Sequence, residues 1–352
     1  TTNAQGLAST ELTNTLSGTA TVTAKINAQS IAVDTQFVAD GSTAVIVKGD
    51  LTVTADNAKA DGHATNAVQA KVTDANGNLV PNASVSFSAD NGATIATATA
   101  TTNDQGLATT SLTNLTTGVA KVTATINSSS QVVNTHFVAD DGTATIVSGN
   151  LTVLVNNAKA NGADTNSVQA KVTDANGNLV PNTVVSFTAN HGATVITASA
   201  TTNENGLATT TLTNVSAGVT NVSAAINGNS QNIDTTFVAD DSTSTIVKGD
   251  LTVIINNAKA NGTDSNKVQA KVTDANGNLV PNTPVSFTAN NGATVVTALV
   301  TTDSQGLAST SLTNITAGIT KVTATVNANS QVVDTTFTAD DSTATIVSGD
   351  LT

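Results

Sequence analysis

The sequence predicts an all-β protein built from tandem antiparallel β-sandwich domains, and two observations carry this prediction. The stretch KVTDANGNLVPN occurs three times, starting at Lys71, Lys171 and Lys271, so the chain repeats every 100 residues. Within one repeat, short runs of alternating apolar and polar residues are separated by turn signals such as Asn-Gly. About six to eight short strands per hundred residues indicate a sandwich of two sheets.

The strands expected in one repeat follow from a period of two in its apolar residues. They cover residues 151–155, 168–172, 185–189, 208–212, 222–226 and 233–237. In the repeated stretch, Asp174–Gly177 reads as a tight hairpin turn whose Asn-Gly supplies the residues with positive φ. Leu179 and Val180 resume a strand, and Pro181 ends it. The only helix-like stretch, residues 156–160, is too short to count as a helix.

Comparison of the copies within the chain predicts which face of each strand is buried. The position of Ile233 is always Val or Ile, and the position of Phe237 is always Phe, whereas the residues between them vary. Variation concentrates where packing does not discriminate between side chains, on the solvent face. We therefore expect a core of Val, Ile, Leu, Ala and Phe, in which Phe187 and Phe237 are central.

Composition excludes several classes of function. The 352 residues carry 12 Lys+Arg, all of them Lys, against 25 Asp+Glu, for a net charge of −13. This balance argues against nucleic-acid binding and against contact with an anionic membrane. The absence of Cys excludes disulfides, zinc–thiolate sites and thiol nucleophiles. No apolar run approaches the ~18 residues of a membrane span, so direct membrane insertion is not expected. The chain starts with Thr and holds about three and a half repeats, so we expect a fragment of a longer protein.

One repeat resembles the invasin/intimin-type bacterial Ig-like domain of outer-membrane adhesins. The resemblance rests on NSVQAKVTDANGNLVPNTVVSFTAN from Asn166, TTNENGLATTTLTN from Thr201, AGVTNVSAAING from Ala217 and TTFVAD from Thr235. It covers nearly the whole chain, although aromatic residues are scarcer here than in that family. It implies Ig-like sandwiches in an elongated rod, with boundaries near Asp240–Thr243 rather than at the competing polar stretch 161–166. The expected parts are half of a domain (1–40), complete domains (44–140, 144–240 and 244–340) and the first strand of another (341–352).

The histidines do not predict a catalytic or metal site. His63, His136 and His191 each occupy a different position of the repeat, where the other copies carry Ala, Thr or Asn. A catalytic or metal-binding histidine needs partners at a matching place, and the sequence offers none. His136 is expected on the outward face of its strand. We therefore interpret all three as solvated polar residues and expect no catalytic site and no cofactor.

Paired aspartates at the expected domain boundaries are the candidate metal ligands. Calcium takes six to eight oxygen ligands, and carboxylates at a linker could supply several of them. Against calcium, the first boundary has Asp40-Gly41, with one carboxylate fewer, and no D-x-D-x-D-G loop occurs. Polar linker residues explain the pairs without metal, so no metal is expected and calcium is the alternative. The candidates are Asp140, Asp141, Asp240, Asp241, Asp340 and Asp341.

The other recurring charged residues have simpler interpretations. Asp74, Asp174 and Asp274 are expected to accept hydrogen bonds from backbone N–H groups of their turns. Two lysine positions recur in every complete repeat. A lysine–asparagine crosslink would need a lysine that is buried beside an asparagine and a carboxylate, whereas Lys171 is expected to point outward from its strand. We therefore interpret the lysines at both positions as solvated residues that discourage strand addition. These lysines are Lys59, Lys159, Lys259, Lys71, Lys171 and Lys271.

These observations favour a mechanical function. The copies align without insertions, whereas enzymes commonly carry their chemistry on loops of irregular length, so no enzyme is expected. Near-identical modules of roughly 35–40 Å each would form a rod. By resemblance, the rod is the stalk of a bacterial cell-surface adhesin, anchored in the outer membrane by a domain outside this segment. Its partners would be the neighbouring repeats and, through a distal tip, a host-cell receptor or glycan. In the alternative, the repeats themselves bind a receptor, a glycan or a sister rod.

Overall fold

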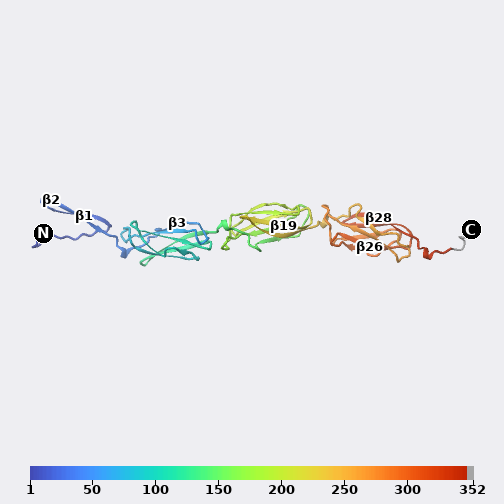
Figure 1. The fold of residues 1–352 in the computed structure, drawn as a ribbon, viewed down its shortest axis with the longest axis horizontal. Coiled ribbons are helices and arrows are strands. Elements are labelled where there is room, and N and C mark those ends of the chain that lie inside the picture. Colours follow the sequence, from blue (N-terminus) through green and yellow to red (C-terminus); the bar gives the residue numbers. More distant parts are fainter. Residues whose placement is uncertain (347–352) are drawn as a thin grey trace. The chain divides into compact units, whose positions relative to one another are not determined.

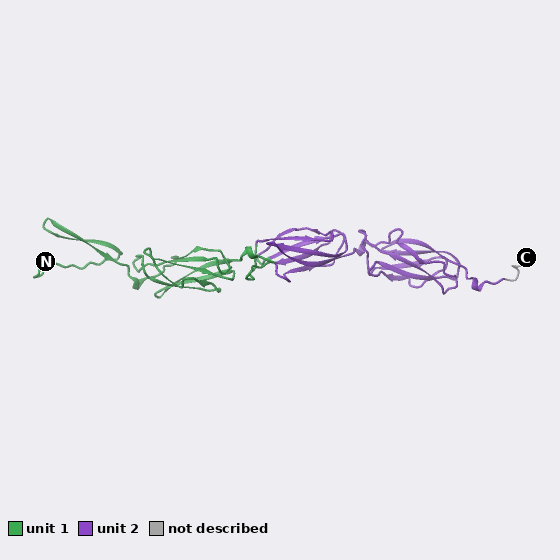
Figure 2. Cartoon of the chain, in the orientation of Figure 1, with its two compact units in different colours: residues 1–145, 172–181, 204–206 green, residues 146–171, 182–203, 207–352 purple. Residues whose placement is uncertain are grey.

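The computed structural model describes residues 1–346, which form β-strands, turns and single-turn 3-10 helices (Figure 1). Contacts between residues divide the chain into two compact units, shown in green and purple in Figure 2. Unit 1 comprises residues 1–145, 172–181 and 204–206, and unit 2 comprises residues 146–171, 182–203 and 207–352. Loop 172–181 of the second complete repeat therefore groups with the repeat that precedes it. No helix among residues 1–346 is long and apolar enough to cross a membrane.

The N-terminal part of unit 1 is a two-stranded antiparallel hairpin. Strand β1 (Gly18–Ile26) pairs with β2 (Gln29–Phe37), so that Gly18 lies opposite Phe37. The hairpin corresponds to the last two strands of a complete repeat. The 3-10 helix η1 (Gly41–Thr43) follows, and the side chain of Asp40 caps it.

The first complete repeat consists of two sheets packed face to face. One sheet has the order β3-β5-β9-β7 and the other the order β4-β11-β10-β6-β8. The strands are β3 (Leu51–Ala55), β4 (Ala58–Lys59), β5 (Asn66–Lys71), β6 (Ser84–Ala89), β7 (Thr94–Ile95), β8 (Thr99–Thr101), β9 (Leu107–Thr113), β10 (Gly118–Ile126) and β11 (Ser129–Val138), followed by η2 (Asp141–Thr143). The pairs are antiparallel except β4–β11, which is parallel.

The second and third complete repeats have the same topology. The second contains β12 (Leu151–Val155), β13 (Ala158–Lys159), β14 (Asn166–Lys171), β15 (Val184–Ala189), β16 (Thr194–Val195), β17 (Ser199–Thr201), β18 (Leu207–Thr213), β19 (Gly218–Ile226), β20 (Asn229–Val238) and η3 (Asp241–Thr243). The third contains β21 (Leu251–Ile255), β22 (Ser265–Lys271), β23 (Pro284–Ala289), β24 (Thr294–Val295), β25 (Leu299–Thr301), β26 (Leu307–Thr313), β27 (Gly318–Val326), β28 (Asn329–Phe337) and η4 (Asp341–Thr343). In the third repeat a parallel bridge between Lys259 and Thr338 replaces the short second strand, the counterpart of β4 and β13.

The all-β sandwich and the buried faces predicted from the period of two are confirmed. All six expected runs of the second complete repeat are strands, and the unassigned stretches 194–195 and 199–201 add two short ones. The helix-like stretch 156–160 instead contains β13, because Ala158 and Lys159 pair with β20. Phe187 and Phe237 are each 1% exposed. Burying each such ring stabilises the fold by roughly 1.5–3 kcal/mol.

The sequence interpretation of the Asp-Ala-Asn-Gly turn is partly wrong. Gly77 has a φ of +83°, but Asn76 does not adopt a positive φ. The N–H of Gly77 donates to the carbonyl oxygen of Asp74 at 3.0 Å, which closes a four-residue turn instead of a two-residue Asn-Gly hairpin loop. The asparagine that does adopt a positive φ is Asn82, immediately after Pro81, with a φ of +57°.

The expected first strand of a further domain lies outside the described residues. Within residues 341–352 the structure describes η4 (Asp341–Thr343). By the 100-residue repeat the strand would begin at position 351, beyond residue 346.

Candidate functional site at the junctions between repeats

The loop Asp-Ala-Asn-Gly-Asn, here called the junction loop, covers residues 74–78, 174–178 and 274–278. The aspartate of this loop accepts hydrogen bonds from backbone N–H groups of the same loop. The Oδ1 of Asp174 accepts hydrogen bonds from the N–H groups of Asn176 and Asn178, both at 2.9 Å. Asp174 is 3% exposed, so these bonds replace the water that the carboxylate loses on burial. The expected turn-acceptor role is confirmed, but the carboxylate has a second oxygen with a different task.

That second oxygen holds the linker between two repeats. The Oδ2 of Asp174 accepts the N–H of Asp140 at 3.1 Å, and Oδ2 of Asp274 accepts the N–H of Asp240 at 3.0 Å. The same bond joins Asp74 to Asp40 at 3.1 Å. The linker backbone is therefore tied to the repeat that follows it. At the first junction, hydrogen bonds led by the one from the Asn78 side chain hold the pKa of Asp74 below its ordinary value.

The last asparagine of the junction loop reaches the preceding repeat. Nδ2 of Asn278 donates to the carbonyl oxygen of Val215 at 2.9 Å, and its Oδ1 accepts the N–H of Ala217 at 2.8 Å. Asn178 makes the equivalent pair with Leu115 and Thr117, at 2.9 and 3.1 Å. One amide side chain thus pairs with both a donor and an acceptor of the neighbouring repeat. The two bonds fix the orientation of that amide group.

The middle asparagine of the junction loop adds a further bond to the preceding repeat. Nδ2 of Asn176 donates to the carbonyl oxygen of Ala60 at 2.9 Å, and Nδ2 of Asn276 donates to that of Ala160 at 2.8 Å. At the first junction Asn78 alone makes the contact, with Thr15 and Ser17, both at 2.9 Å. The junction loop within the repeated stretch KVTDANGNLVPN therefore forms contacts between repeats. Sequence reasoning recognised its turn but missed this role.

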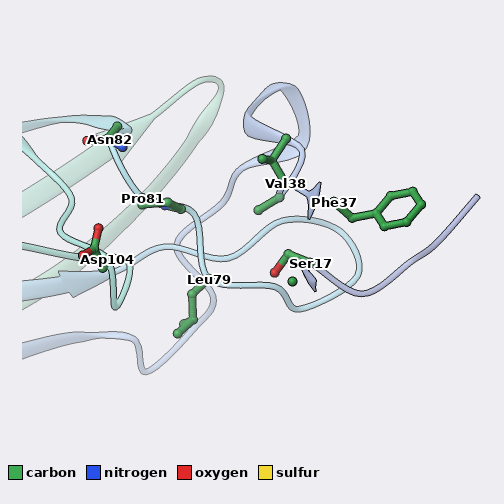
Figure 3. Close-up of a pocket in the computed structure, with 9 residues that line it drawn as sticks. Ser17, Phe37, Val38, Leu79, Pro81, Asn82 and Asp104 are labelled. Atoms are coloured by element: carbon green, nitrogen blue, oxygen red, sulfur yellow. The ribbon is translucent and has the colours of Figure 1, made fainter. Parts of the chain in front are cut away.

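A depression lies beside the junction loop where two repeats meet. At the first junction it has a volume of about 480 Å³. Figure 3 shows Leu79, Pro81, Asn82 and Asp104 from the complete repeat, with Ser17, Phe37 and Val38 from the hairpin before it. A depression of about 540 Å³ occupies the equivalent place between the second and third complete repeats. It is lined by counterparts from both, including Phe237, Val238, Leu279, Pro281 and Asn282.

The paired aspartates bind a lysine. Nζ of Lys59 lies 2.8 Å from Oδ1 of Asp140 and 2.8 Å from Oδ1 of Asp141. Lys159 lies 3.0 and 2.7 Å from Asp240 and Asp241. These lysines remain 37–44% exposed, in agreement with the interpretation as solvated residues. The interpretation missed their ion pairs, which form because β4 and β13 place Lys59 and Lys159 beside the last residues of their own repeats. The third repeat shows the same arrangement, with Lys259, Asp340 and Asp341.

Both members of this ion pair remain charged. The hydrogen bonds that Lys59 donates to Asp140 and Asp141 raise the pKa of Lys59, and the same hydrogen bonds lower the pKa of both carboxyls. An amide crosslink would require a neutral amine, which this environment opposes. In contrast, Lys171, which precedes the junction loop, is exposed as expected.

The lysine also bears on the calcium alternative. A calcium ion shared by Asp140 and Asp141 would have to displace the ammonium group that lies 2.8 Å from each. Among residues 1–346 no group of three or more His, Asp or Glu side chains is arranged to hold a metal ion. The absence of metal and cofactor stays a prediction, and chelation tests it.

One of the three histidines has a partner that sequence reasoning missed. Nδ1 of His136 lies 3.5 Å from Oδ2 of Asp56, and the N–H of His136 donates to Oδ1 of Asp56 at 2.7 Å. These hydrogen bonds, the one from His136 N–H first, lower the pKa of Asp56 to about 2. The other repeats have Asn156 with Thr236 and Asn256 with Thr336. Positions 56 and 136, which are 80 residues apart, both differ from their counterparts in the other repeats. This joint change was the signal in the sequence from which the pair could have been found.

The remaining histidines lie apart from such a pair. His63 is exposed, and its backbone N–H donates to the carboxylate of Asp61 at 2.7 Å. His191 is exposed, and its Nε2 lies 3.3 Å from the carbonyl oxygen of Ala217. Each histidine thus contacts a different loop or strand, and the structure brings no two of them into one site.

Comparisons with known proteins agree with this fold. The bacterial Ig-like domain (group 1) model matches residues 48–138, 148–238 and 248–338. The inverse autotransporter adhesin YeeJ of Escherichia coli (strain K12) is 30% identical over 305 residues, which cover 82% of this chain but 13% of YeeJ. The chain therefore spans a small part of this relative, whose full length includes regions without a counterpart here.

Two solved structures show the same fold at lower identity. The Escherichia coli adhesin FdeC is 21% identical with a TM-score of 0.58, covering 86% of this chain and 100% of that one. InvD of Yersinia pseudotuberculosis is 15% identical with a TM-score of 0.58, covering 83% of this chain and 98% of that one. The three matched repeats show that the chain belongs to the bacterial Ig-like domain (group 1) family.

Proposed function

We propose that this chain is a non-enzymatic spacer in the stalk of a bacterial cell-surface adhesin. The observation that carries the proposal is the repeated junction contact. Asn178 and Asn278 each bind a carbonyl oxygen and an N–H group of the repeat before them. A spacer needs junctions that resist bending, and hydrogen bonds from a loop that is held together by its buried aspartate provide that resistance.

The linkers support the same function. Residues Asp240–Ser244 contain η3, whose first turn is capped by the side chain of Asp240. The Nδ2 of Asn327, in the hairpin turn of the following repeat, donates to the carbonyl oxygen of Asp241 at 2.8 Å. The linker thus has hydrogen-bond partners along its length, unlike a flexible Gly/Ser-rich connection. Repeats joined in this way would extend the stalk by roughly 35–40 Å each.

The relative YeeJ, named an inverse autotransporter adhesin, guides the rest of the proposal. The stalk would lie outside the cell, anchored through an outer-membrane domain beyond this segment. A distal tip, also beyond this segment, would bind a host-cell receptor or glycan. Within the chain, the partners of each repeat are its neighbouring repeats. The acidic net charge of −13 would keep parallel stalks apart and soluble.

Surface display with varied repeat number tests the spacer function. Versions with one, two or three complete repeats are placed between an unrelated outer-membrane anchor and a tip that binds a known ligand. We expect the height of the tip to rise in equal steps, and a segment without a tip to give no adhesion. A height independent of repeat number would contradict the spacer function.

The binding alternative has one structural feature in its favour. Edge strands β12 and β21 expose aliphatic side chains, with Leu154 and Val155 at 53% and 50% and Ile254 and Ile255 at 51% and 50%. Exposed apolar surface is a common basis for protein association. If the repeats bind a receptor or a sister stalk, tipless display would give adhesion or clumping that grows with repeat number and disappears in the variant with Thr at these four positions.

A further inference from the structure

We propose that the short second strand of each repeat (β4 or β13, a single bridge at Lys259 in the third repeat) and the last strand, paired in parallel and tied by the lysine–aspartate ion pair, form a clamp that bears tension along the chain. The inference rests on the proposed spacer function, because a stalk between a cell and its target transmits the pull between them. It assigns a second task to each repeat, which is to stay folded while it is pulled.

The direction of the paired strands is the first support. Ala58 of β4 lies opposite Phe137 of β11, and the strands run parallel. The chain arrives at β4 from the start of the repeat and leaves β11 at its end. A pull on both ends therefore drags the two strands in opposite directions along their own axes. The cross-strand bonds are then loaded together, whereas in a hairpin opened from its ends they break one after another.

Backbone hydrogen bonds extend the pairing beyond the two strand residues. In the first complete repeat the N–H of Asn57 donates to the carbonyl oxygen of His136 at 3.0 Å, and the N–H of Ala60 to that of Val138 at 2.8 Å. The second and third repeats keep both bonds, at distances of 2.7–3.0 Å. Their donors are Asn157, Ala160, Asn257 and Ala260.

A buried asparagine connects the same two strands from a third. The Oδ1 of Asn66 accepts the N–H of Ala58 at 2.9 Å, and its Nδ2 donates to the carbonyl oxygen of His136 at 2.8 Å. Asn66 is fully buried. Sliding β4 along β11 would strip both bonds while the amide is out of reach of water, which is costly. Asn166 and Asn266 repeat this arrangement.

The ion pair closes the clamp at the point where the chain leaves the repeat. Lys159 is the last residue of β13, and Asp240 and Asp241 follow the end of β20. The side chain of Asp240 is 9% exposed and its Oδ1 lies 3.0 Å from the lysine Nζ. Tension on the linker therefore acts directly on this contact before it reaches the strand.

Single-molecule stretching of the whole chain tests the clamp. Each of the three complete repeats should unfold in one step at constant force. Lys159→Met keeps the apolar part of the side chain and removes the charge. We expect the lifetime of one step to fall about tenfold while the other two steps, which serve as internal controls, stay unchanged. Lys171→Met, at an exposed lysine of the same repeat, should leave all three lifetimes unchanged.

Two outcomes would overturn the clamp. One is three unchanged lifetimes for Lys159→Met. The other is an acceleration of unfolding in denaturant as large as that under force, which would make Lys159 a general stabiliser. Asp241→Asn, at a carboxylate that is 69% exposed, repeats the test with less risk to folding. Because force lifetimes are measured on the isolated chain, they stand or fall independently of the display experiment.

Discussion

Removal of the Asn278 side chain should loosen the junction between the second and third complete repeats. Asn278→Ala deletes two hydrogen bonds to the preceding repeat, with Val215 and Ala217. A hydrogen bond contributes about 0.5–1.5 kcal/mol net, so the closed junction should lose about 1–3 kcal/mol. The junction should therefore open about 5- to 150-fold more often.

Amide hydrogen exchange of the whole chain measures this opening. The reporter is the N–H of Asp240, which donates to Oδ2 of Asp274, an oxygen that also accepts Nδ2 of Asn278. Its protection should fall by the same factor, while core amides of both repeats keep theirs. Asn232→Ala is the matched control, because Asn232 is exposed on the outward face of β20. Unchanged protection of Asp240 in Asn278→Ala would refute the role assigned to the junction loop.

Three further predictions concern single repeats. Ser244→Ala should stabilise the third repeat by about 1 kcal/mol in denaturant unfolding, because the Ser244 hydroxyl is buried without a partner and the other copies carry Ala; a loss of stability would contradict this. The folded pKa of Asp56, about 2, lies below its ordinary 3.8, so its contribution is complete above pH 3.8 and is lost as the pH falls towards 2. Because Asp56 is 35% exposed, screening limits this contribution to about 1 kcal/mol. Asp56→Asn should therefore reduce the acid dependence of the first repeat by that amount, while Asp74, Asp140 and Asp141, whose pKa values are also lowered, keep the rest. EDTA should leave the melting temperature unchanged, because Lys59 already binds Asp140 and Asp141; a drop that calcium reverses would assign calcium to the junctions.

The sandwich could be predicted because its cause is local. Alternation at Val168, Ala170 and Val172 reflects one buried face, and the structure buries all three. Recurrence of Phe237 in every copy likewise identified a core position. A period of two and turn residues at fixed spacing are properties of short segments, so the sequence displays them directly.

The junction could not be predicted because its contacts join distant segments. Asn278 directly follows the predicted turn, and its two partners lie 61 and 63 residues away in another repeat. Lys159 and Asp240 are 81 residues apart and meet only because β13 runs parallel to β20. The sequence does show that this lysine and this aspartate recur at the same spacing in every complete repeat. Duplication alone would produce the same recurrence, so it does not reveal a contact. Side-chain partners across a junction depend on how two folded surfaces meet.

Small-angle scattering of the whole chain, with and without the junction contacts, tests the central claim most directly. The wild type should behave as an extended particle at least about 100 Å long, since three complete repeats contribute roughly 35–40 Å each. The triple variant Asn78→Ala, Asn178→Ala and Asn278→Ala should keep its folded repeats but give the broad distance distribution of a flexible chain of beads. A radius of gyration of about 20 Å for the wild type, as for one compact domain of this length, would contradict the spacer. Identical scattering from wild type and variant would contradict the role of the junction loop.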